Sequence, residues 1–85
     1  MKFHIAGIPY RNLDLSKLKV GMKLYLTPEI GNSHDPHAIQ IVLNGQLLGY
    51  VPKAHNNNIE IIRSKTATIL EINPKNKWAE VLIEV

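Results

Sequence analysis

Residues Ala38–Val51 read AIQIVLNGQLLGYV, and this segment predicts the β-hairpin around which the rest of the fold is built. Two apolar runs flank Asn44-Gly45, a dipeptide that tolerates the positive φ angles of a two-residue hairpin turn. That turn would pair Ile41 with Leu48 and would leave both faces of the hairpin partly apolar. This pattern is typical of a central hairpin in a closed or strongly curved sheet, and Gly49 is a candidate position for a β-bulge.

The segments on either side of the hairpin predict further strands. Four runs combine β-branched and aromatic residues or alternate with a period of two, and they lie at residues 2–8, 22–27, 65–72 and 78–85. In the last run the alternate residues from Ala79 to Val85 are apolar, and Trp78 begins the opposite, more polar face. A short helical turn is expected within residues 12–20.

One helix is expected after the hairpin. Pro52 suits the first turn of a helix that runs to about Arg63, and Ala54, Ile59 and Ile62 would form its packing face. Five or six short strands with one helix between the fourth and fifth strands predict a mainly β (α+β) fold. We expect a small modified barrel of the oligonucleotide-binding (OB) type.

The length and composition predict one small globular domain that spans residues 1–85. A chain of 85 residues has room for a single core, because a chain of this size buries only about 60% of the surface that its unfolded form exposes. Its residues are 45% apolar and 20% charged, which is typical of globular proteins and unlike disordered ones. The absence of cysteine excludes disulfides and thiolate metal sites, and it favours a reducing compartment.

No segment predicts a signal peptide or a membrane span. Residues 1–20 lack an uninterrupted apolar run, and no run of about 18 apolar residues occurs anywhere in the sequence. We therefore expect a cytoplasmic protein with no membrane partner. Ten Lys and Arg residues against seven Asp and Glu residues give a net charge of +3. That excess is too common among small domains to establish a polyanionic partner by itself.

A polar loop precedes the hairpin. Residues 31–37, GNSHDPH, combine turn-forming residues with ionisable and hydrogen-bonding side chains. One interpretation is an ordinary turn, in which Asn32 and Asp35 cap backbone amides and Pro36 stops helix growth. The other is a binding loop, because such a composition costs stability unless the loop binds a ligand. The residues alone leave both interpretations open.

Catalytic and metal-binding hypotheses depend on the same loop. His34 and His37 flank Asp35 at a spacing that could hold one metal ion, and His4 and His55 are the remaining histidines. Structural zinc takes four ligands, usually including thiolates, and no such pattern occurs in the sequence. We therefore expect no metal, no cofactor and no catalysis by this domain alone. A metal-binding accessory domain of a hydrolase is the weakest alternative.

Four motifs of this chain resemble those of the HIRAN domain in order and spacing. They are Ile5–Ile8 (IAGI), Leu18–Leu24 (LKVGMKL), Gly31–Ile39 (GNSHDPHAI) and Leu48–Lys53 (LGYVPK). The resemblance covers nearly the whole chain, and the last two strands match mainly by pattern. It implies a modified OB barrel that binds single-stranded DNA, as in the N-terminal regions of SWI/SNF-type DNA translocases of replication-fork repair. The best understood eukaryotic member captures the free 3′-hydroxyl end of a strand.

The resemblance also implies which residues contact DNA. Asn32, His34 and Asp35 would hold the terminal nucleotide, with the Asp35 carboxylate accepting a hydrogen bond from the 3′-hydroxyl. Tyr50 and Lys53 would approach sugar and phosphate, where the Lys53 ammonium acts as a point charge. A short, sequence-tolerant site of two or three nucleotides follows from this set.

Two aromatic positions complete the implied groove. Trp78 lies where the family places an aromatic residue against the bases, and His4 lines the groove from the first strand. Phe3-His4 stands where the eukaryotic 3′-end binder has Arg-Tyr, so one phosphate-binding guanidinium is missing. The leading hypothesis is therefore single-strand binding in DNA repair or fork processing, with capture of 3′ ends as the part to be tested.

Two further expectations concern partners. Any helicase, ATPase or nuclease activity associated with the family would come from a partner in trans, because an 85-residue domain has no room for it. The alternative to DNA binding is a protein-interaction module of the same fold, in which the loop and hairpin dock a partner chain.

Overall fold

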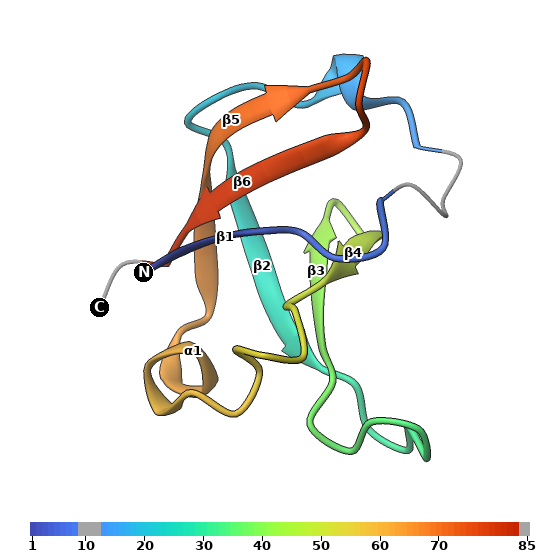
Figure 1. The fold of residues 1–85 in the computed structure, drawn as a ribbon, viewed down its shortest axis with the longest axis vertical. Helices are drawn as coiled ribbons and strands as arrows, with labels where there is room; N and C mark the ends of the chain where they lie inside the picture. The colour runs from blue at the N-terminus through green and yellow to red at the C-terminus, as the bar shows by residue number, and fades with distance from the viewer. Residues whose placement is uncertain (9–12, 84–85) are drawn as a thin grey trace.

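The computed structural model describes residues 1–8 and 13–83, and its strands form one antiparallel sheet (Figure 1). Within the described residues the strands are β1 (Lys2–His4), β2 (Lys23–Pro28), β3 (Ile39–Leu43), β4 (Gln46–Tyr50), β5 (Thr66–Asn73) and β6 (Trp78–Leu82). Their order in the sheet is β1-β6-β5-β2-β3-β4. A helix, α1 (Ile59–Arg63), lies between β4 and β5, and a short 3-10 helix, η2 (Leu15–Lys17), precedes β2. The prediction of a mainly β fold with a helix between the fourth and fifth strands is confirmed.

The two edges of the sheet meet at a place that we call the seam, formed by Ala6, Gly49 and Tyr50. The backbone N–H of Ala6 donates to the carbonyl oxygen of Tyr50 (2.8 Å), and the N–H of Tyr50 donates back to Ala6 (2.9 Å). A Cβ atom on Gly49 would collide with the Ala6 carbonyl oxygen and with the Ile5 side chain. Because the chain after β1 reaches β4 in this way, the sheet curls into an OB-like half-barrel (Figure 1).

The hairpin lies where the sequence predicts it, but its register differs from the prediction. Asn44 and Gly45 have φ angles of 51° and 78°, as a two-residue turn with two left-handed positions requires. Further from the turn Ile41 pairs with Gly49, so the predicted pairing of Ile41 with Leu48 is wrong. A β-bulge inserts Leu48 as an extra residue, and this shift brings Gly49 to the seam.

The helix after the hairpin is much shorter than predicted. The expected helix over Pro52–Arg63 is wrong, because residues 53–57 form turns and α1 starts only after Asn58. The Asn58 side-chain oxygen accepts a hydrogen bond from a backbone N–H of the first helical turn (2.8 Å), as an N-cap does. Asparagine is a poor helix former but a strong N-cap, so the run of three asparagines at 56–58 delays the helix.

The predicted packing face of this helix is also wrong. Ile59 and Ile62 are 57% and 50% exposed, and Ala54 is exposed as well. Ile61 is instead the residue of α1 that enters the core, with 1% of its surface exposed. The later start changes the phase of the helix relative to the sheet, and the helix therefore presents a different residue to the core.

The other predicted elements are confirmed where the structure describes them. The expected turn within residues 12–20 contains η2, and the strands expected at 22–27, 65–72 and 78–85 appear as β2, β5 and β6. The first strand is shorter than the predicted 2–8, because β1 ends at His4. Beyond it the Ile5 N–H donates to the Ala79 carbonyl oxygen (3.0 Å), and Ala6 pairs with Tyr50 of β4. Position 12 and residues 84–85, which belong to two of these predictions, lie outside the described residues.

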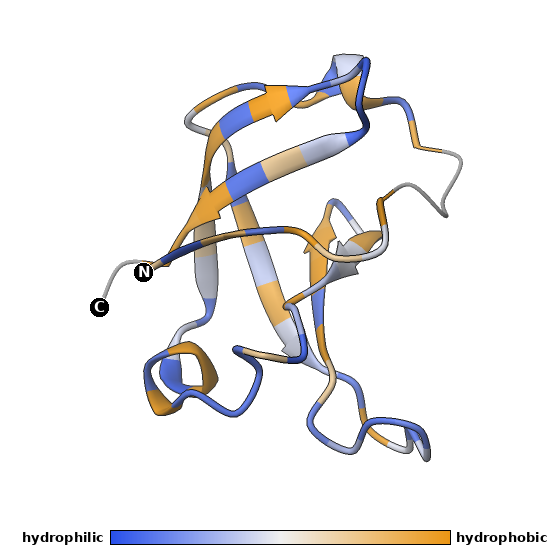
Figure 2. Ribbon diagram, viewed as in Figure 1, coloured by the Kyte–Doolittle hydropathy of each residue, from blue (hydrophilic) through white to orange (hydrophobic). Residues whose placement is uncertain are grey.

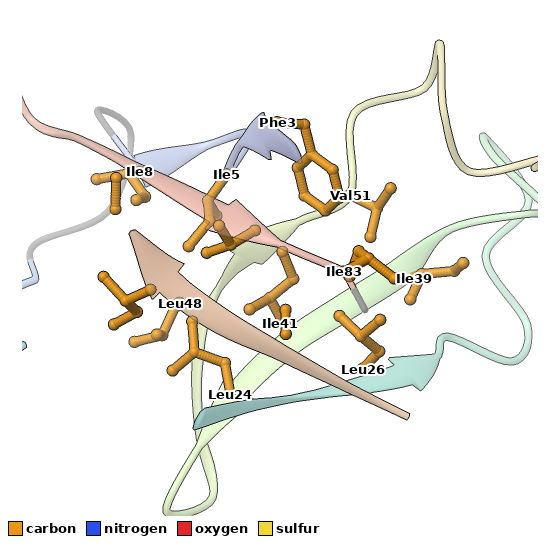
Figure 3. Close-up of a cluster of buried hydrophobic side chains, with 14 of the residues drawn as sticks. Phe3, Ile5, Ile8, Leu24, Leu26, Ile39, Ile41, Leu48, Val51 and Ile83 are labelled. Carbon is orange, nitrogen blue, oxygen red and sulfur yellow. The ribbon is translucent and has the colours of Figure 1, made fainter. Parts of the chain in front are cut away.

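The core fills the inside of the curled sheet. Apolar and polar residues alternate along β2 (Figure 2), and half-buried and buried residues alternate along β6, so each strand turns one face inward. Leu24, Ile41, Ile69 and Val81 have no exposed surface, and Figure 3 shows side chains from several strands meeting in this interior. Since the apolar faces are used for packing, polar residues at the strand ends and in the loops remain available for binding.

Candidate nucleic-acid interface

We call the loop between β2 and β3 the polar loop (residues 29–38). A backbone hydrogen bond closes its base, and side-chain hydrogen bonds within the loop fix its conformation. The backbone N–H of Glu29 donates to the carbonyl oxygen of Ala38 (2.9 Å) across the base of the loop. The side-chain oxygen of Asn32 accepts hydrogen bonds from the backbone N–H groups of His34 and Asp35, each at 2.9 Å. The capped-turn interpretation of Asn32 therefore describes the geometry correctly.

Asp35 connects the polar loop to the segment that follows β4. One carboxylate oxygen accepts from the backbone N–H of His37 (3.1 Å), and the other accepts from the side-chain amide of Asn56 (2.9 Å). Asn56 is only 4% exposed and is the buried polar residue of the described chain. A buried amide needs hydrogen-bond partners, so this contact fixes the polar loop against residues 50–56.

Glu29 makes a second connection from the polar loop. Its Oε2 accepts from the side-chain amide of Asn32 (3.0 Å), and its Oε1 accepts from Gln40 Nε2 (3.2 Å) and from the hydroxyl of Tyr50 (3.1 Å). Gln40 lies on β3 and Tyr50 ends β4. One carboxylate thus links the loop to two neighbouring strands.

These contacts join three of the predicted site residues, Asn32, Asp35 and Tyr50, in one network between the polar loop and segment 50–56. The two connections reach this segment at Tyr50 and at Asn56, and Lys53 lies between them in the chain with its side chain exposed. His34 is exposed on the polar loop, which also carries the predicted residues Asn32 and Asp35. The surface therefore combines a fixed polar loop with an exposed cation.

The remaining two predicted residues form a separate aromatic pair. The His4 and Trp78 rings stack with centroids 4.6 Å apart and an interplanar angle of 5°. His4 Nε2 lies 3.8 Å from a carboxylate oxygen of Glu80, and the His4 side chain is 55% exposed. Trp78 begins β6, which starts at the opposite end of the view in Figure 1 from the polar loop. The structure does not bring this pair into contact with Asn32 or Asp35.

Phe3, the neighbour of His4 in β1, packs against segment 50–56. Phe3 points into the core and stacks with His55 of segment 50–56 at a centroid distance of 6.0 Å. Because successive residues of a strand point to opposite faces, His4 is held on the outside of β1. Segment 50–56 is thus connected to β1 through Phe3, the chain neighbour of His4.

Three residues of this network were missed by the sequence analysis. Glu29, Gln40 and Asn56 supply the contacts that hold the predicted residues in place. For Asn56 a signal was available, because three consecutive asparagines are costly in a helix and are better explained by side-chain hydrogen bonds. Glu29 and Gln40 carry no such signal, since a single polar residue at a strand end or on a half-buried face is ordinary.

A pocket of about 180 Å³ lies behind the polar loop, between β2, β3 and α1. Its lining is mostly apolar and includes Leu26, Pro28, Pro36, Ile39, Ile61 and Ile62. None of the seven predicted DNA-binding residues lines it. The pocket shares Pro36, His37, Ala38 and Asn56 with the polar loop and segment 50–56, but none of the side chains predicted to contact DNA.

The metal-site alternative receives no support from the described geometry. Across residues 1–8 and 13–83, no three His, Cys, Asp or Glu side chains gather closely enough to hold a metal ion, and this includes His34, Asp35 and His37. The helices in this part of the chain are also too short to span a membrane.

The fold and the interface define a small OB-like half-barrel with a hydrogen-bonded polar loop beside its hairpin. The family model of the HIRAN domain matches residues 1–85, so the chain belongs to the HIRAN family. Membership of this family suggests a nucleic-acid-binding module.

A solved structure supports the fold. The crystal structure of a protein from Lactobacillus plantarum, a structural genomics target, is similar with a TM-score of 0.76 and 23% sequence identity. The similarity covers 94% of this chain and 85% of that chain. No curated protein matches this chain.

Proposed function

We propose that this domain is a non-enzymatic module that binds single-stranded DNA on the surface formed by the polar loop and segment 50–56. The observation that carries the proposal is the pair of connections from Glu29 to Tyr50 and from Asp35 to Asn56. They fix the polar loop before any ligand arrives, and a preorganised loop loses less entropy on binding than a mobile one. The exposed ammonium of Lys53 would contact a backbone phosphate without reading sequence.

The chemistry of the polar loop favours a free 3′-hydroxyl over a 3′-phosphate. Each oxygen of the Asp35 carboxylate accepts one hydrogen bond from the protein, and a carboxylate oxygen has room for a second. A 3′-hydroxyl can therefore donate to Asp35, and a bond to an ionised acceptor is about twice as strong as a neutral one. A phosphate at the same place would be repelled by both Asp35 and Glu29.

The aromatic pair would hold a base further along the strand. His4 covers one face of Trp78, so a base would stack on the exposed outer face of His4 or against the uncovered part of Trp78. Stacking accepts any base, which fits a module that binds strands of any sequence. A helicase, ATPase or nuclease acting on the bound strand would be a separate partner.

The test is a fluorescence anisotropy titration with labelled oligothymidine. Three probes are compared: a single strand ending in a 3′-hydroxyl, the same strand ending in a 3′-phosphate, and a blunt duplex. We expect the first to bind best and the duplex worst. Equal affinity for the two single strands would overturn the 3′-end part of the proposal, and no binding to either would overturn it entirely.

A matched variant tests which part of the domain binds the strand. Ile62→Ser changes the apolar pocket, which shares no predicted site residue with the interface, and Ile62 is half-exposed so that the substitution should be tolerated. The variant should bind oligothymidine as the unmodified protein does, whereas Lys53→Ala should weaken binding and reduce its salt dependence by about one phosphate contact. Loss of binding in Ile62→Ser alone would move the interface to the pocket.

A further inference from the structure

Glu29 is placed so that one side chain controls both halves of the proposed interface. Its backbone N–H closes the base of the polar loop on Ala38, and its carboxylate accepts at least three hydrogen bonds. The three donors come from the loop (Asn32), from β3 (Gln40) and from β4 (Tyr50). A carboxylate can accept all of them at once because both of its oxygens are acceptors.

The contact with Asn32 decides how the amide of that residue is oriented. With Nδ2 donating to Glu29 (3.0 Å), Oδ1 points into the loop and accepts from the N–H groups of His34 and Asp35. A rotation of the amide by half a turn would place its NH2 group against those two donors. Glu29 therefore selects the orientation of Asn32 that organises the loop.

The effect of Glu29 extends along the chain of hydrogen bonds. Asn32 holds the backbone N–H of Asp35, and the Asp35 carboxylate in turn holds Asn56. The chain of contacts that begins at Tyr50 thus ends at Asn56, six residues further along the same segment. These contacts therefore hold the turn that contains Lys53 at both of its ends, Tyr50 and Asn56.

We propose that Glu29 is a positioning residue for DNA binding: it fixes Asn32 and Tyr50 in their binding geometry without touching the strand itself. This inference rests on the proposed function. The direction in which DNA affinity changes when Glu29 is replaced distinguishes this role from a simple charge effect. A carboxylate beside a phosphate-binding surface repels DNA, so removing its charge should strengthen binding if charge were its only contribution.

The substitution Glu29→Gln isolates the hydrogen-bonding role because it nearly preserves shape. A glutamine side chain has one acceptor oxygen, and its second terminal atom is an NH2 donor. If the oxygen faces Tyr50 and Gln40, the NH2 group faces the NH2 group of Asn32, and if the side chain turns over, the contact with Tyr50 is lost instead. One half of the interface must therefore lose its connection, whereas Glu29→Ala loses both.

The experiment measures the free protein first. In an NMR spectrum of the uniformly 15N-labelled domain, the side-chain amide protons of Asn32 should exchange faster with water in Glu29→Ala, and also in Glu29→Gln where the glutamine oxygen faces Tyr50. Unchanged exchange in both variants would overturn the inference without any ligand being present.

The same variants are then titrated with the 3′-hydroxyl oligothymidine. We expect Glu29→Gln to bind about tenfold more weakly, the factor that corresponds to losing one charge-assisted hydrogen bond, and Glu29→Ala to bind more weakly still. Glu60→Gln is the control, because it removes one negative charge at an exposed position of α1, and it should bind as tightly as the unmodified protein or more tightly.

The outcomes separate this inference from the proposed function. If the unmodified protein binds and Glu29→Gln binds equally or more tightly, the positioning role is overturned and the proposed function stands. If the unmodified protein does not bind at all, the proposed function is overturned, and the positioning role for DNA falls with it.

Discussion

The seam and the polar loop both contain family motifs, but they are held together by different kinds of contact. The seam depends on backbone hydrogen bonds between Ala6 and Tyr50 and on the missing side chain of Gly49. The polar loop depends on side-chain hydrogen bonds made by Glu29 and Asp35. The backbone contacts of the seam form as the sheet curls, so they belong to the fold itself. The side-chain contacts of the polar loop can be removed one at a time by substitution.

This difference indicates a division of roles within the motifs. Changes at the seam should act on folding, because the edges of the sheet meet there. Changes in the polar loop should act mainly on ligand binding and cost less stability. Tyr50 belongs to both regions, since its backbone closes the seam and its hydroxyl reaches Glu29.

The largest loss of stability is expected for Gly49→Ala. The added methyl group would collide with the backbone of Ala6, which cannot move without opening the seam. We expect a loss of about 3 kcal/mol or more in the free energy of unfolding, measured by urea denaturation. Gly31→Ala in the polar loop is the comparison: its φ of 84° makes a side chain strained, but open space surrounds it, and the loss should be about 1 kcal/mol. Equal losses in the two variants would contradict the distinction between the regions.

The next largest loss of stability is expected for Asn56→Ala. This change removes the partner of one Asp35 oxygen and leaves a small gap at a buried position. We expect a loss of about 1–3 kcal/mol in unfolding free energy together with weaker oligonucleotide binding. The exposed neighbour Asn57 provides the control, because Asn57→Ala should change stability by less than about 0.5 kcal/mol. A stable Asn56→Ala variant with unchanged binding would show that the loop does not need this connection.

The comparison also explains how far the sequence could predict the structure. Strand positions and the hairpin turn were predictable because Asn44-Gly45 and the alternation in residues 78–83 are local patterns. The register beyond the turn was not, because the bulge at Leu48 is determined by the need to bring Gly49 against a segment more than forty residues away.

The candidate site shows the same limit. Asn32, Asp35 and Tyr50 are joined through side chains that the sequence did not single out, Glu29 and Asn56, which are distant from one another in the sequence. The predicted start of the helix was wrong for a related reason. A cap at Asn58 and a buried Asn56 satisfy tertiary contacts that propensity alone does not describe.

A smaller effect on stability is expected for Trp78→Ala, outside both regions. Trp78 is half-buried and stacks on His4, so the variant should still unfold cooperatively while binding oligothymidine more weakly by about 1 kcal/mol. The estimate is at the low end for base stacking because His4 already occupies one face. Tyr25→Ala, which removes a half-exposed aromatic from β2, is the control and should leave binding unchanged. A large loss of thermal stability in Trp78→Ala would instead assign Trp78 to the core.

The smallest effect is expected at Asp14, which caps η2 as Asn32 caps the polar loop but is fully exposed. Hydrogen bonds from the Ser16 hydroxyl and backbone N–H lower the pKa of Asp14, with a smaller contribution from the charge of Lys17. A lowered pKa in the folded state stabilises the protein above the ordinary pKa of the group, and this contribution is lost as the pH falls through the folded value.

Ser16→Ala should therefore raise the pKa of Asp14 towards its ordinary value, and Lys17→Ala should raise it less, as an NMR titration of the Asp14 carboxyl carbon would measure. Neither change should alter unfolding at neutral pH as Asn56→Ala does, because the Asp14 cap joins residues two apart, whereas the Asp35–Asn56 contact joins residues 21 apart. A contact between distant residues holds a larger part of the fold together than a local cap. A neutral-pH destabilisation by Ser16→Ala equal to that of Asn56→Ala would show that capping alone, and not the connection between segments, stabilises such loops.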